Sequence, residues 1–410
     1  MTGLLGGGHA LHWDGREAVN LDCFVTVPSG PRRELVELHV PFGEELVHYA
    51  IGPGSCAVPG LPAGLGELHA RYGRLPWPRL VEPALALARS GVVMPPAHAG
   101  CLAMLASVFT LRAAGAAIYA PEGRPLAAGE LLQQPGLVAA LELLRDEGPR
   151  SVYRGSLAEA LLTGMEGVTI TRRDLERYEA RWTEPVAVPY AGTSFLTRAG
   201  LSGVPGAIAR LPRPAARSAT DWTLAVIAAL AGETSEGHTT NLVAVDRDGC
   251  VCVLTTTLGL GSGDFLPGLD LHLNSMLGET DLLHTPLEPG ARMESMMAPS
   301  LALDADGPVL ALGAAGGTRL RTALVGVAAA ILGEALNPVA AVDRPRAHPV
   351  GRLVNAEPGV DEGALARLEA EGWDVRRWPA LHHYFGGVSL IGRAGAAGDP
   401  RRSGHAALLP

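Results

Sequence analysis

The residues that could do chemistry centre on a pair of threonines. Thr239 and Thr240 open a run, Thr239 to Val245, that alternates as a half-buried strand does. A threonine hydroxyl is a weak nucleophile and needs a neighbouring base before it can attack a carbonyl carbon. A threonine is also an ordinary strand residue, because its branched side chain packs well on a sheet. This run alone leaves both interpretations open.

A second candidate is the glycine pair Gly316-Gly317, which precedes a long apolar run from about Leu320 to Leu332. Glycines let the backbone approach a substrate closely, so their N–H groups could stabilise an oxyanion. By itself the pair is a weak signal, because Gly-Gly before a helix is often a tight turn.

Composition excludes several other mechanisms. All 33 basic residues are arginines, so no lysine can form a Schiff base, bind phosphate in a P-loop or activate a serine. Codon bias in a GC-rich genome is the simple explanation for this absence. A formal net charge of −9, with no basic run longer than a pair, argues against a nucleic-acid or anionic membrane surface. We therefore expect a small-molecule partner.

Cysteines and histidines indicate no metal site. The five cysteines include no CxxC pair, which argues against a zinc ribbon, and their odd number argues against a disulfide framework. His348, His382 and His383 lack the spacing of metal ligands, so we expect structural or surface roles for them. The sequence thus predicts no metal and no cofactor.

Two predicted hairpins surround the candidate residues. Thr239–Val245 turns back through Asp246–Gly249 into Cys250–Thr257, and Ser300–Leu303 turns back into Pro308–Leu312. Further strands are predicted at 10–12 and 18–27, and helices at 77–90, 137–144, 157–162, 171–178 and 222–231. This order predicts an α+β fold, an antiparallel sheet covered by helices, rather than βαβ units.

The run from Glu236 to Gly249 resembles the self-cleavage junction of the γ-glutamyltransferase (γ-glutamyltranspeptidase) family, where Thr-Thr opens a strand ending in Val-Asp-x-Asp-Gly. Further matches follow in the family's order along nearly the whole chain. They are Val58-Pro59-Gly60, Tyr72-Gly73, Leu75-Pro76, Pro83-Ala84, Ala88-Arg89-Ser90-Gly91, Gly148-Pro149, Tyr153-Arg154-Gly155, the 171–178 helix, Asn274, Arg292, Met297-Ala298-Pro299-Ser300, Gly316-Gly317, Pro345-Arg346 and Asp399-Pro400-Arg401.

The resemblance implies a four-layer αββα N-terminal nucleophile hydrolase that cuts itself between His238 and Thr239. Residues 1–238 and 239–410 would then be large-subunit-like and small-subunit-like fragments, interwoven in one domain as a heterodimer. Thr239 would become the nucleophile, with its own new α-amino group as base, since the reference pKa of that group is about 7.7–8.0. Thr240 is the other candidate nucleophile. The resemblance also assigns a supporting hydroxyl to Thr257 and the oxyanion hole to Gly316 and Gly317.

The implied substrate-binding positions depart from the family. Phe24 stands where an arginine binds the γ-glutamyl carboxylate, and a serine pair has become Ser295-Met296. Leaving that carboxylate unpaired should cost on the order of 2–5 kcal/mol. Arg32, Arg33 and Arg198 are candidates to replace the lost arginine, but the sequence does not place them.

Three further positions differ from the family: one lies two residues after the supporting threonine, and two contact the donor's amine. Gly259 replaces an asparagine, Met276 replaces a polar residue, and Glu279 stands where an aspartate binds the ammonium group. The residue expected to bind the donor's amine is therefore still acidic, whereas most residues expected to bind the donor's carboxylate have been replaced.

The sequence thus predicts an autoprocessing amidase or acyltransferase for a small amide or γ-glutamyl-like substrate. Two alternatives stay open: a catalytically impaired homologue that serves as a binding or structural module, and an amidase for a non-glutamyl acyl group.

The resemblance also implies a further N-terminal region and a longer segment between Gly206 and Thr239 than this sequence has. Either the gene model starts too late or this is a compact variant. The sequence as written carries no signal peptide and no apolar stretch that could cross a membrane, which predicts a cytoplasmic protein. Under the first explanation, any export signal would lie in the missing part.

Overall fold

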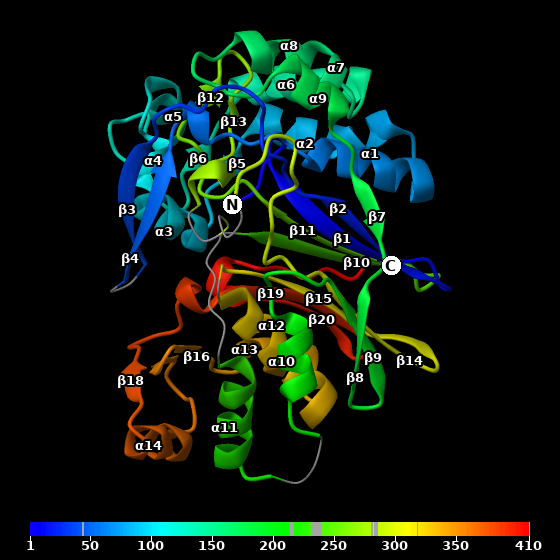
Figure 1. Cartoon of the computed structure of the whole chain (residues 1–410), viewed down its shortest axis with the longest axis vertical. Coiled ribbons are helices and arrows are strands. Elements are labelled where there is room, and N and C mark those ends of the chain that lie inside the picture. The colour runs from blue at the N-terminus through cyan, green and yellow to red at the C-terminus, as the bar shows by residue number, and fades with distance from the viewer. Residues whose placement is uncertain are drawn as a thin grey trace. The chain divides into compact units, whose positions relative to one another are not determined.

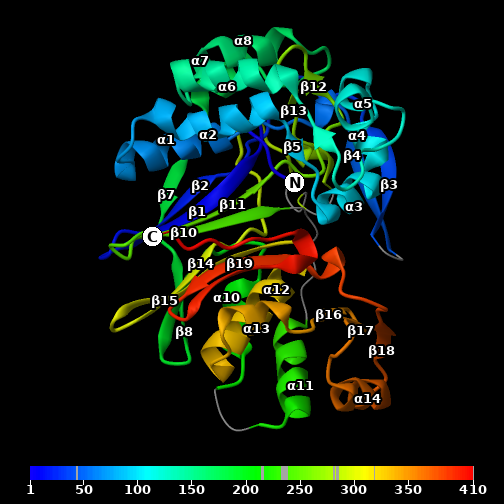
Figure 2. The same ribbon diagram turned by 180° about the vertical axis from the view of Figure 1, so that it is seen from behind.

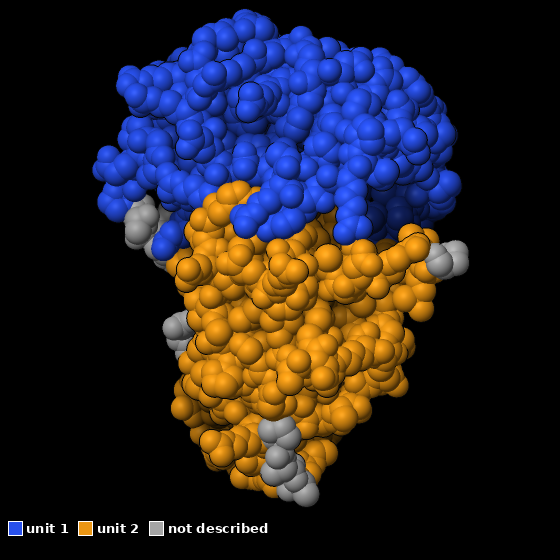
Figure 3. All heavy atoms as spheres, turned by 90° about the vertical axis from the view of Figure 1, so that its right-hand side faces the viewer, with its two compact units in different colours: residues 1–8, 22–181, 256–294 blue, residues 9–21, 182–255, 295–410 orange. Residues whose placement is uncertain are grey.

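The computed structural model describes residues 1–42, 45–213, 217–231, 239–279, 282, 286–317 and 319–409. The chain forms two compact units, each assembled from separate segments (Figure 3). Unit 1 comprises residues 1–8, 22–181 and 256–294, and unit 2 comprises residues 9–21, 182–255 and 295–410. Each unit is described by itself.

Unit 2 is built around two sheets. The first has the strand order β10-β11-β1-β2-β7, and several of its strands run on into segments of unit 1. Its strands are β1 (Gly7–Trp13), β2 (Ala18–Cys23), β7 (Arg181–Thr183), β10 (Thr240–Val245) and β11 (Val251–Thr257). The second sheet has the order β20-β19-β15-β14-β9-β8. Its strands are β8 (Val186–Tyr190), β9 (Thr193–Thr197), β14 (Ser300–Asp304), β15 (Gly307–Ala315), β19 (Gly387–Gly392) and β20 (Gly395–Gly398).

The two sheets of unit 2 pack face to face (Figure 1). Leu11 and Val253 from the first sheet share one buried cluster with Leu196, Leu301 and Ala311 from the second. Helices cover the other face of the second sheet, where a larger apolar core forms. They are α10 (Val204–Arg210), α12 (Arg319–Ala328) with a π-helical turn to Gly333, and α13 (Pro338–Asp343); α11 (Ala219–Leu230) packs against α10 and α12.

Unit 1 is mainly helical (Figure 2). Its helices are α1 (Leu61–Tyr72), α2 (Trp77–Ser90), α3 (Pro96–Met104), α4 (Ala106–Phe109), α5 (Ala113–Tyr119), α6 (Pro135–Glu147), α7 (Ser151–Arg154), α8 (Ser156–Thr163) and α9 (Arg172–Arg177). Three short strand pairs accompany them: β3 (Val36–Phe42) with β4 (Glu45–Ile51), β5 (Val92–Val93) with β6 (Leu131–Leu132), and β12 (Phe265–Leu266) with β13 (Leu271–His272).

Both hairpins predicted around the candidate residues are confirmed. β10 and β11 are neighbours joined by a turn, in which Gly249 N–H donates to the Asp246 carbonyl. β14 and β15 pair antiparallel, with Ser300 opposite Leu312. The helix at Trp77–Ser90 has the bounds that its sequence predicts, and Thr171 and Asp174 form the predicted reciprocal capping box of α9.

One local prediction is wrong. The expectation of no βαβ unit fails at β17 (Leu353–Ala356), α14 (Glu362–Ala370) and β18 (Asp374–Arg377), because β17 and β18 pair in parallel. Asp361 caps α14, and the helix supplies the crossover that a parallel pair requires. β16 (Ala347–Val350) completes this small sheet at the edge of unit 2 as an antiparallel neighbour.

Among the described residues, none of the helices has both the length and the apolar character needed to cross a bilayer.

Candidate active site

Thr239 is a buried residue directly before β10, with 6% of its surface exposed. Two residues further on, Asn241 packs so closely on Gly313 of β15 that a side chain at Gly313 would overlap it. Val243 of β10 packs on the cluster that contains Ala311 of β15. β10 and β15 therefore run in opposite directions, and the start of β10 lies toward the end of β15. His238, the other side of the predicted cleavage bond, lies outside the described residues.

The glycine pair follows the end of β15 directly. Gly316 and Gly317 are buried and have φ angles of +136° and +65°, which favour glycine. A side chain at Gly316 would also collide with Gly386, which precedes β19. Both the backbone angles and the crowding therefore require glycine at position 316.

The N–H groups of this pair have an unusual property. Within the described part of the chain, neither the Gly316 nor the Gly317 N–H donates a hydrogen bond, although both residues are buried. Buried backbone donors without acceptors are rare in folded proteins. Two such donors at the end of β15, toward which Thr239 lies, are suited to receive a negatively charged oxygen.

Positive charge lies close to the glycine pair. A Cβ placed on Gly316 would be 3.4 Å from Arg402 Nη2, and Arg319 begins α12 two residues after Gly317. Arg319 lies over the Tyr384 ring at 4.7 Å and donates through Nε to the Tyr384 carbonyl. The Arg402 guanidinium would favour an anion at the glycine pair.

The neighbouring histidines are held neutral. Burial, followed by the charges of His382, Arg402 and Arg319, lowers the pKa of His383 to about 3. Burial likewise lowers the pKa of His348, whose Nδ1 shares a hydrogen bond of 2.8 Å with the Thr322 hydroxyl. A histidine that is neutral and committed to a structural contact does not have the properties of a charge-switching catalytic group at neutral pH.

Ser295 and Met296 lie in the segment before β14, and both are buried. Because β14 and β15 are antiparallel neighbours, this segment leaves the sheet at the same end as Gly316. Arg198, which follows β9, donates from Nη1 to the Ser295 carbonyl at 2.7 Å. Of the three arginines proposed as replacements, Arg198 thus contacts a predicted substrate-binding segment, whereas Arg32 reaches the Leu287 carbonyl in unit 1.

A second group of predicted residues gathers in unit 1. The Thr257 hydroxyl accepts a hydrogen bond of 2.8 Å from the Gly259 N–H. Gly259 has a φ of +69°, and a side chain there would overlap the Glu279 carboxylate and the Ser275 hydroxyl. The buried Glu279 carboxylate therefore occupies the space that a residue larger than glycine would need at position 259.

Met276 and Phe24 are also buried in unit 1. Met276 begins a 3₁₀ turn, and its N–H donates to Asn274 Oδ1. The Phe24 carbonyl accepts hydrogen bonds from the Tyr178 hydroxyl and from Arg292. Phe24 thus contributes an apolar side chain where the resemblance implies a charged one.

The buried cysteines do not offer an alternative nucleophile. Burial raises the pKa of both Cys23 and Cys56 to about 12. A thiol with such a pKa is almost entirely protonated at neutral pH, and the thiolate is the reactive form.

Sequence reasoning missed Asn241 and Gly386. Asn241 accepts a hydrogen bond of 2.8 Å from the Thr255 hydroxyl, which joins β10 to β11, and Gly386 presses against Gly316. The sequence could not identify Asn241 as a site residue, because nothing in it shows that this strand asparagine packs on Gly313. Gly386 belongs to a Gly-Gly pair that could have been noticed beside Gly316-Gly317.

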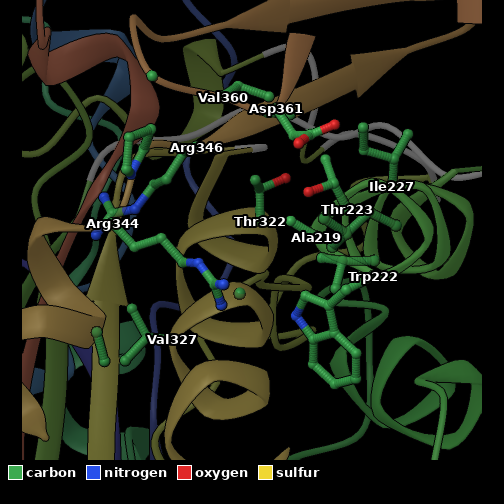
Figure 4. Close-up of a pocket in the computed structure, with 17 residues that line it drawn as sticks. Ala219, Trp222, Thr223, Ile227, Thr322, Val327, Arg344, Arg346, Val360 and Asp361 are labelled. Carbon is green, nitrogen blue, oxygen red and sulfur yellow. The ribbon is translucent and has the colours of Figure 1, made fainter. Parts of the chain in front are cut away.

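Unit 2 also contains an apolar cavity of about 240 Å³ (Figure 4). Trp222 and Ile227 of α11 line one side, and Val327 of α12 and Arg344 line another. The Arg344 guanidinium is paired with Glu334. None of the predicted site residues lines this cavity.

Comparisons with known proteins agree with the resemblance. The family model for gamma-glutamyltranspeptidase matches residues 1–211 and 207–409 of this chain. The acylase ACY 1 proenzyme of Pseudomonas sp. (strain SE83) is 27% identical over 95% of this chain and 82% of its own length. The glutathione hydrolase proenzyme of Bacillus subtilis (strain 168) is 23% identical over 91% of this chain and 78% of its own.

Among solved structures, the cephalosporin acylase from Bacillus halodurans resembles this chain with a TM-score of 0.81 at 20% identity. The match covers 99% of this chain and 88% of that one. The predicted α+β class and the four-layer N-terminal nucleophile hydrolase fold are confirmed by this likeness.

Proposed function

Because this chain belongs to the gamma-glutamyltranspeptidase family, we propose that it is an autoprocessing amidase or acyltransferase with Thr239 as its nucleophile. The observation that carries the proposal is the pair of buried N–H groups at Gly316 and Gly317, which lack acceptors within the described part of the chain. These two glycines follow the end of β15. We infer that β10, the strand that Thr239 precedes, begins near the same end, because Asn241 of β10 packs on Gly313 of β15.

The first proposed step is hydrolysis of the peptide bond between His238 and Thr239, in which one water supplies the hydroxyl of the new His238 carboxyl group and a proton for the new amine. It frees the α-amino group of Thr239, whose reference pKa of about 7.7–8.0 lets it act as a base near neutral pH. Such a group would serve where other bases are poor, because the chain has no lysine and because burial lowers the pKa of His348 and His383, which makes both weak bases. Fragments 1–238 and 239–410 would remain associated.

In the second step, the Thr239 Oγ attacks the carbonyl carbon of an amide while its proton passes to the α-amino group. The carbonyl oxygen becomes an oxyanion, which accepts hydrogen bonds from the Gly316 and Gly317 N–H groups. The C–N bond then breaks, and the leaving amine takes the proton from the α-ammonium group. Water or an acceptor amine attacks the resulting ester and releases the acyl group. Thr257 keeps the supporting role that the resemblance assigns to it.

The proposed acyl donor carries an amine but no adjacent carboxylate. Glu279, the predicted amine binder, is retained and packs beside Gly259. The buried Phe24 stands in place of the arginine that the resemblance expects to bind the donor's carboxylate. Met296 stands in place of one serine of the expected binding pair. Arg198 donates to the Ser295 carbonyl, so at least one of its N–H groups is engaged with the backbone.

Three matched anilides test this specificity. The γ-glutamyl anilide carries both charged groups, the 4-aminobutanoyl anilide lacks only the carboxylate, and the glutaryl anilide lacks only the amine. We expect kcat/KM for the 4-aminobutanoyl anilide to exceed that for the γ-glutamyl anilide by about thirtyfold to a few thousandfold, which corresponds to the cost of about 2–5 kcal/mol for burying an unpaired carboxylate. Preference for the γ-glutamyl anilide at comparable or higher kcat/KM would contradict the proposed donor class.

Thr239→Ala serves as the blank for this assay, and Thr240→Ala is its matched control. The first variant should hydrolyse none of the three anilides, whereas the second should retain activity. The reverse result would identify Thr240 as the nucleophile. A wild-type protein that hydrolyses none of the anilides and stays uncut would instead favour the non-catalytic binding module.

A further inference from the structure

Unit 1 contains a polar cavity of about 300 Å³ that none of the predicted site residues lines. One wall comes from the segment Thr26 to Ser29, a second from α9 and the residues after it, and a third from the loop Pro289 to Arg292. This volume is at the lower end of the range found for small-molecule sites.

The walls of the cavity are tied together by hydrogen bonds. The Val27 N–H donates to the Ala291 carbonyl at 2.9 Å, and the Gly290 N–H donates to the Val27 carbonyl at 2.7 Å. The Ser29 N–H donates to the Asp174 carboxylate at 2.9 Å, which joins the first wall to α9. The cavity is therefore preorganised, which lowers the entropy lost when a ligand binds.

The charge of this cavity contrasts with that of the chain. Arg173, Arg177, Arg181 and Arg292 line it, together with two carboxylates, Asp174 and Glu179. The lining is thus positive in a chain whose formal net charge is −9.

Three of these arginines have no partner within the described part of the chain. The side chains of Arg173, Arg177 and Arg181 are exposed and form neither ion pairs nor hydrogen bonds there, whereas the Arg172 side chain on the same helix forms two hydrogen bonds of 2.8 Å with Glu159. Arg173 and Arg177 are four residues apart on α9, a spacing at which like charges destabilise a helix. An anion between them would relieve this repulsion.

The carboxylates of the lining, Asp174 and Glu179, offset part of this positive charge, but neither forms an ion pair with the three arginines within the described part of the chain. Arg292 lies over the Tyr178 ring at 4.8 Å and donates to the carbonyls of Phe24 and Glu179. Although burial acts to raise the pKa of Asp174, hydrogen bonds from Ser29 and Thr171 keep it below its ordinary value. The Glu179 side chain is exposed and pairs with no described arginine.

From this cavity and its arginines, we propose that unit 1 binds a small oxyanion with two or more negative charges. A guanidinium group donates two parallel hydrogen bonds to a phosphate or a carboxylate, so Arg173, Arg177 and Arg181 suit either chemistry. Tetrahedral phosphate and a polycarboxylate are the two sources of that chemistry. The site is independent of the proposed amidase reaction.

The test measures binding of inorganic phosphate and of citrate by isothermal titration calorimetry, with sodium chloride at equal ionic strength as reference. The wild-type protein should bind one of the two anions saturably, and whichever binds more tightly identifies the source. Arg173→Ala/Arg177→Ala should weaken binding by about tenfold or more, because charge-assisted hydrogen bonds are lost. The exposed arginines of α9 can be removed without opening the core, and an unchanged melting temperature without anion checks this.

Two single variants complete the design. Arg79→Ala removes an exposed arginine on α2 that does not line the cavity, and it should bind the anion as the wild type does. Glu179→Gln removes a competing carboxylate, and it should bind several-fold more tightly. Equal weakening in Arg79→Ala would overturn the site, because net charge alone would then explain the effect. Binding no stronger than that of chloride would overturn it as well.

Discussion

The residues predicted as nucleophile and oxyanion donors lie in unit 2 and have the residue types that the resemblance implies, whereas the residues of unit 1 predicted to bind the substrate differ from those types. In unit 2, Thr239 precedes the strand that packs on β15, and Gly316-Gly317 follows β15 with its N–H groups lacking described acceptors. In unit 1, Gly259 and Glu279 both differ from the residues that the resemblance implies and pack against each other, and Phe24 is a buried apolar residue.

Under the proposed function, the groups that break the bond match the family while the groups that recognise the substrate differ. The oxyanion donors are backbone groups and depend only on the glycines that allow their conformation. Donor binding instead depends on side-chain charge and volume, which single substitutions alter. We therefore expect variants of the glycine pair to reduce hydrolysis of every substrate, and variants at Gly259 or Glu279 to change selectivity.

The largest effect should come from Gly316→Ala. A methyl group there would meet Gly386, and the φ of +136° is unfavourable for alanine, so the N–H would be displaced. Loss of one oxyanion donor lowers kcat by about 10²–10³-fold in other enzymes, and we expect a loss of this order for all three anilides. Single-turnover kinetics with saturating anilide would measure it.

Gly326→Ala in α12 is the matched control, because a methyl group there meets no atom within 4 Å. It should leave kcat unchanged and stabilise the fold by up to about 1 kcal/mol. If Gly316→Ala retained the full kcat, this result would contradict the proposed role of Gly316 and Gly317 as oxyanion donors.

A smaller effect is expected from pH. The Thr239 amine must be unprotonated to accept the hydroxyl proton, so kcat/KM should rise through an inflection near the reference pKa of about 7.7–8.0 and fall by tens of fold toward pH 6. Burial and the surrounding positive charges lower the pKa of His383 to about 3, so His383 should add no inflection near 6.5. His383→Gln should leave the profile unchanged, and loss of the inflection in this variant would assign the base to His383 instead.

The smallest effect is expected from substitutions at Gly259 and Glu279 in unit 1. Gly259→Asn alone should weaken donor binding, because its side chain would overlap the Glu279 carboxylate. Glu279→Asp is shorter by one methylene and should restore part of that loss, with a coupling energy of about 1–2 kcal/mol in a double-mutant cycle. The KM for the γ-glutamyl anilide gives the measurement. Strict additivity of the two single changes would show that they act independently.

Local signals in the sequence predicted much of the fold. Trp77–Ser90 was predicted to its bounds because apolar residues recur at helical spacing between Pro78 and Gly91. The Thr171 capping box was predicted because both of its partners lie within four residues. The hairpins at β10–β11 and β14–β15 have Asp and Gly in their turns, which is typical of such connections.

What the sequence did not reveal depends on distant contacts. The β8–β9 hairpin turns at Ala191-Gly192 without a strong turn signal, and α10 forms within a stretch rich in glycine, proline and arginine. The packing of Glu279 on Gly259 joins residues twenty positions apart that have no shared periodicity. The arginine cavity likewise joins three separate segments of unit 1.

The mass of the purified protein tests the central claim most directly. Intact-mass spectrometry under denaturing conditions should find two fragments, residues 1–238 and 239–410, with a free threonine at the start of the second. Thr239→Ala should give one uncut chain of 42.5 kDa, less only the change of side chain. A wild-type protein that remains a single chain, or a Thr239→Ala variant that is still cut at this bond, would contradict the account.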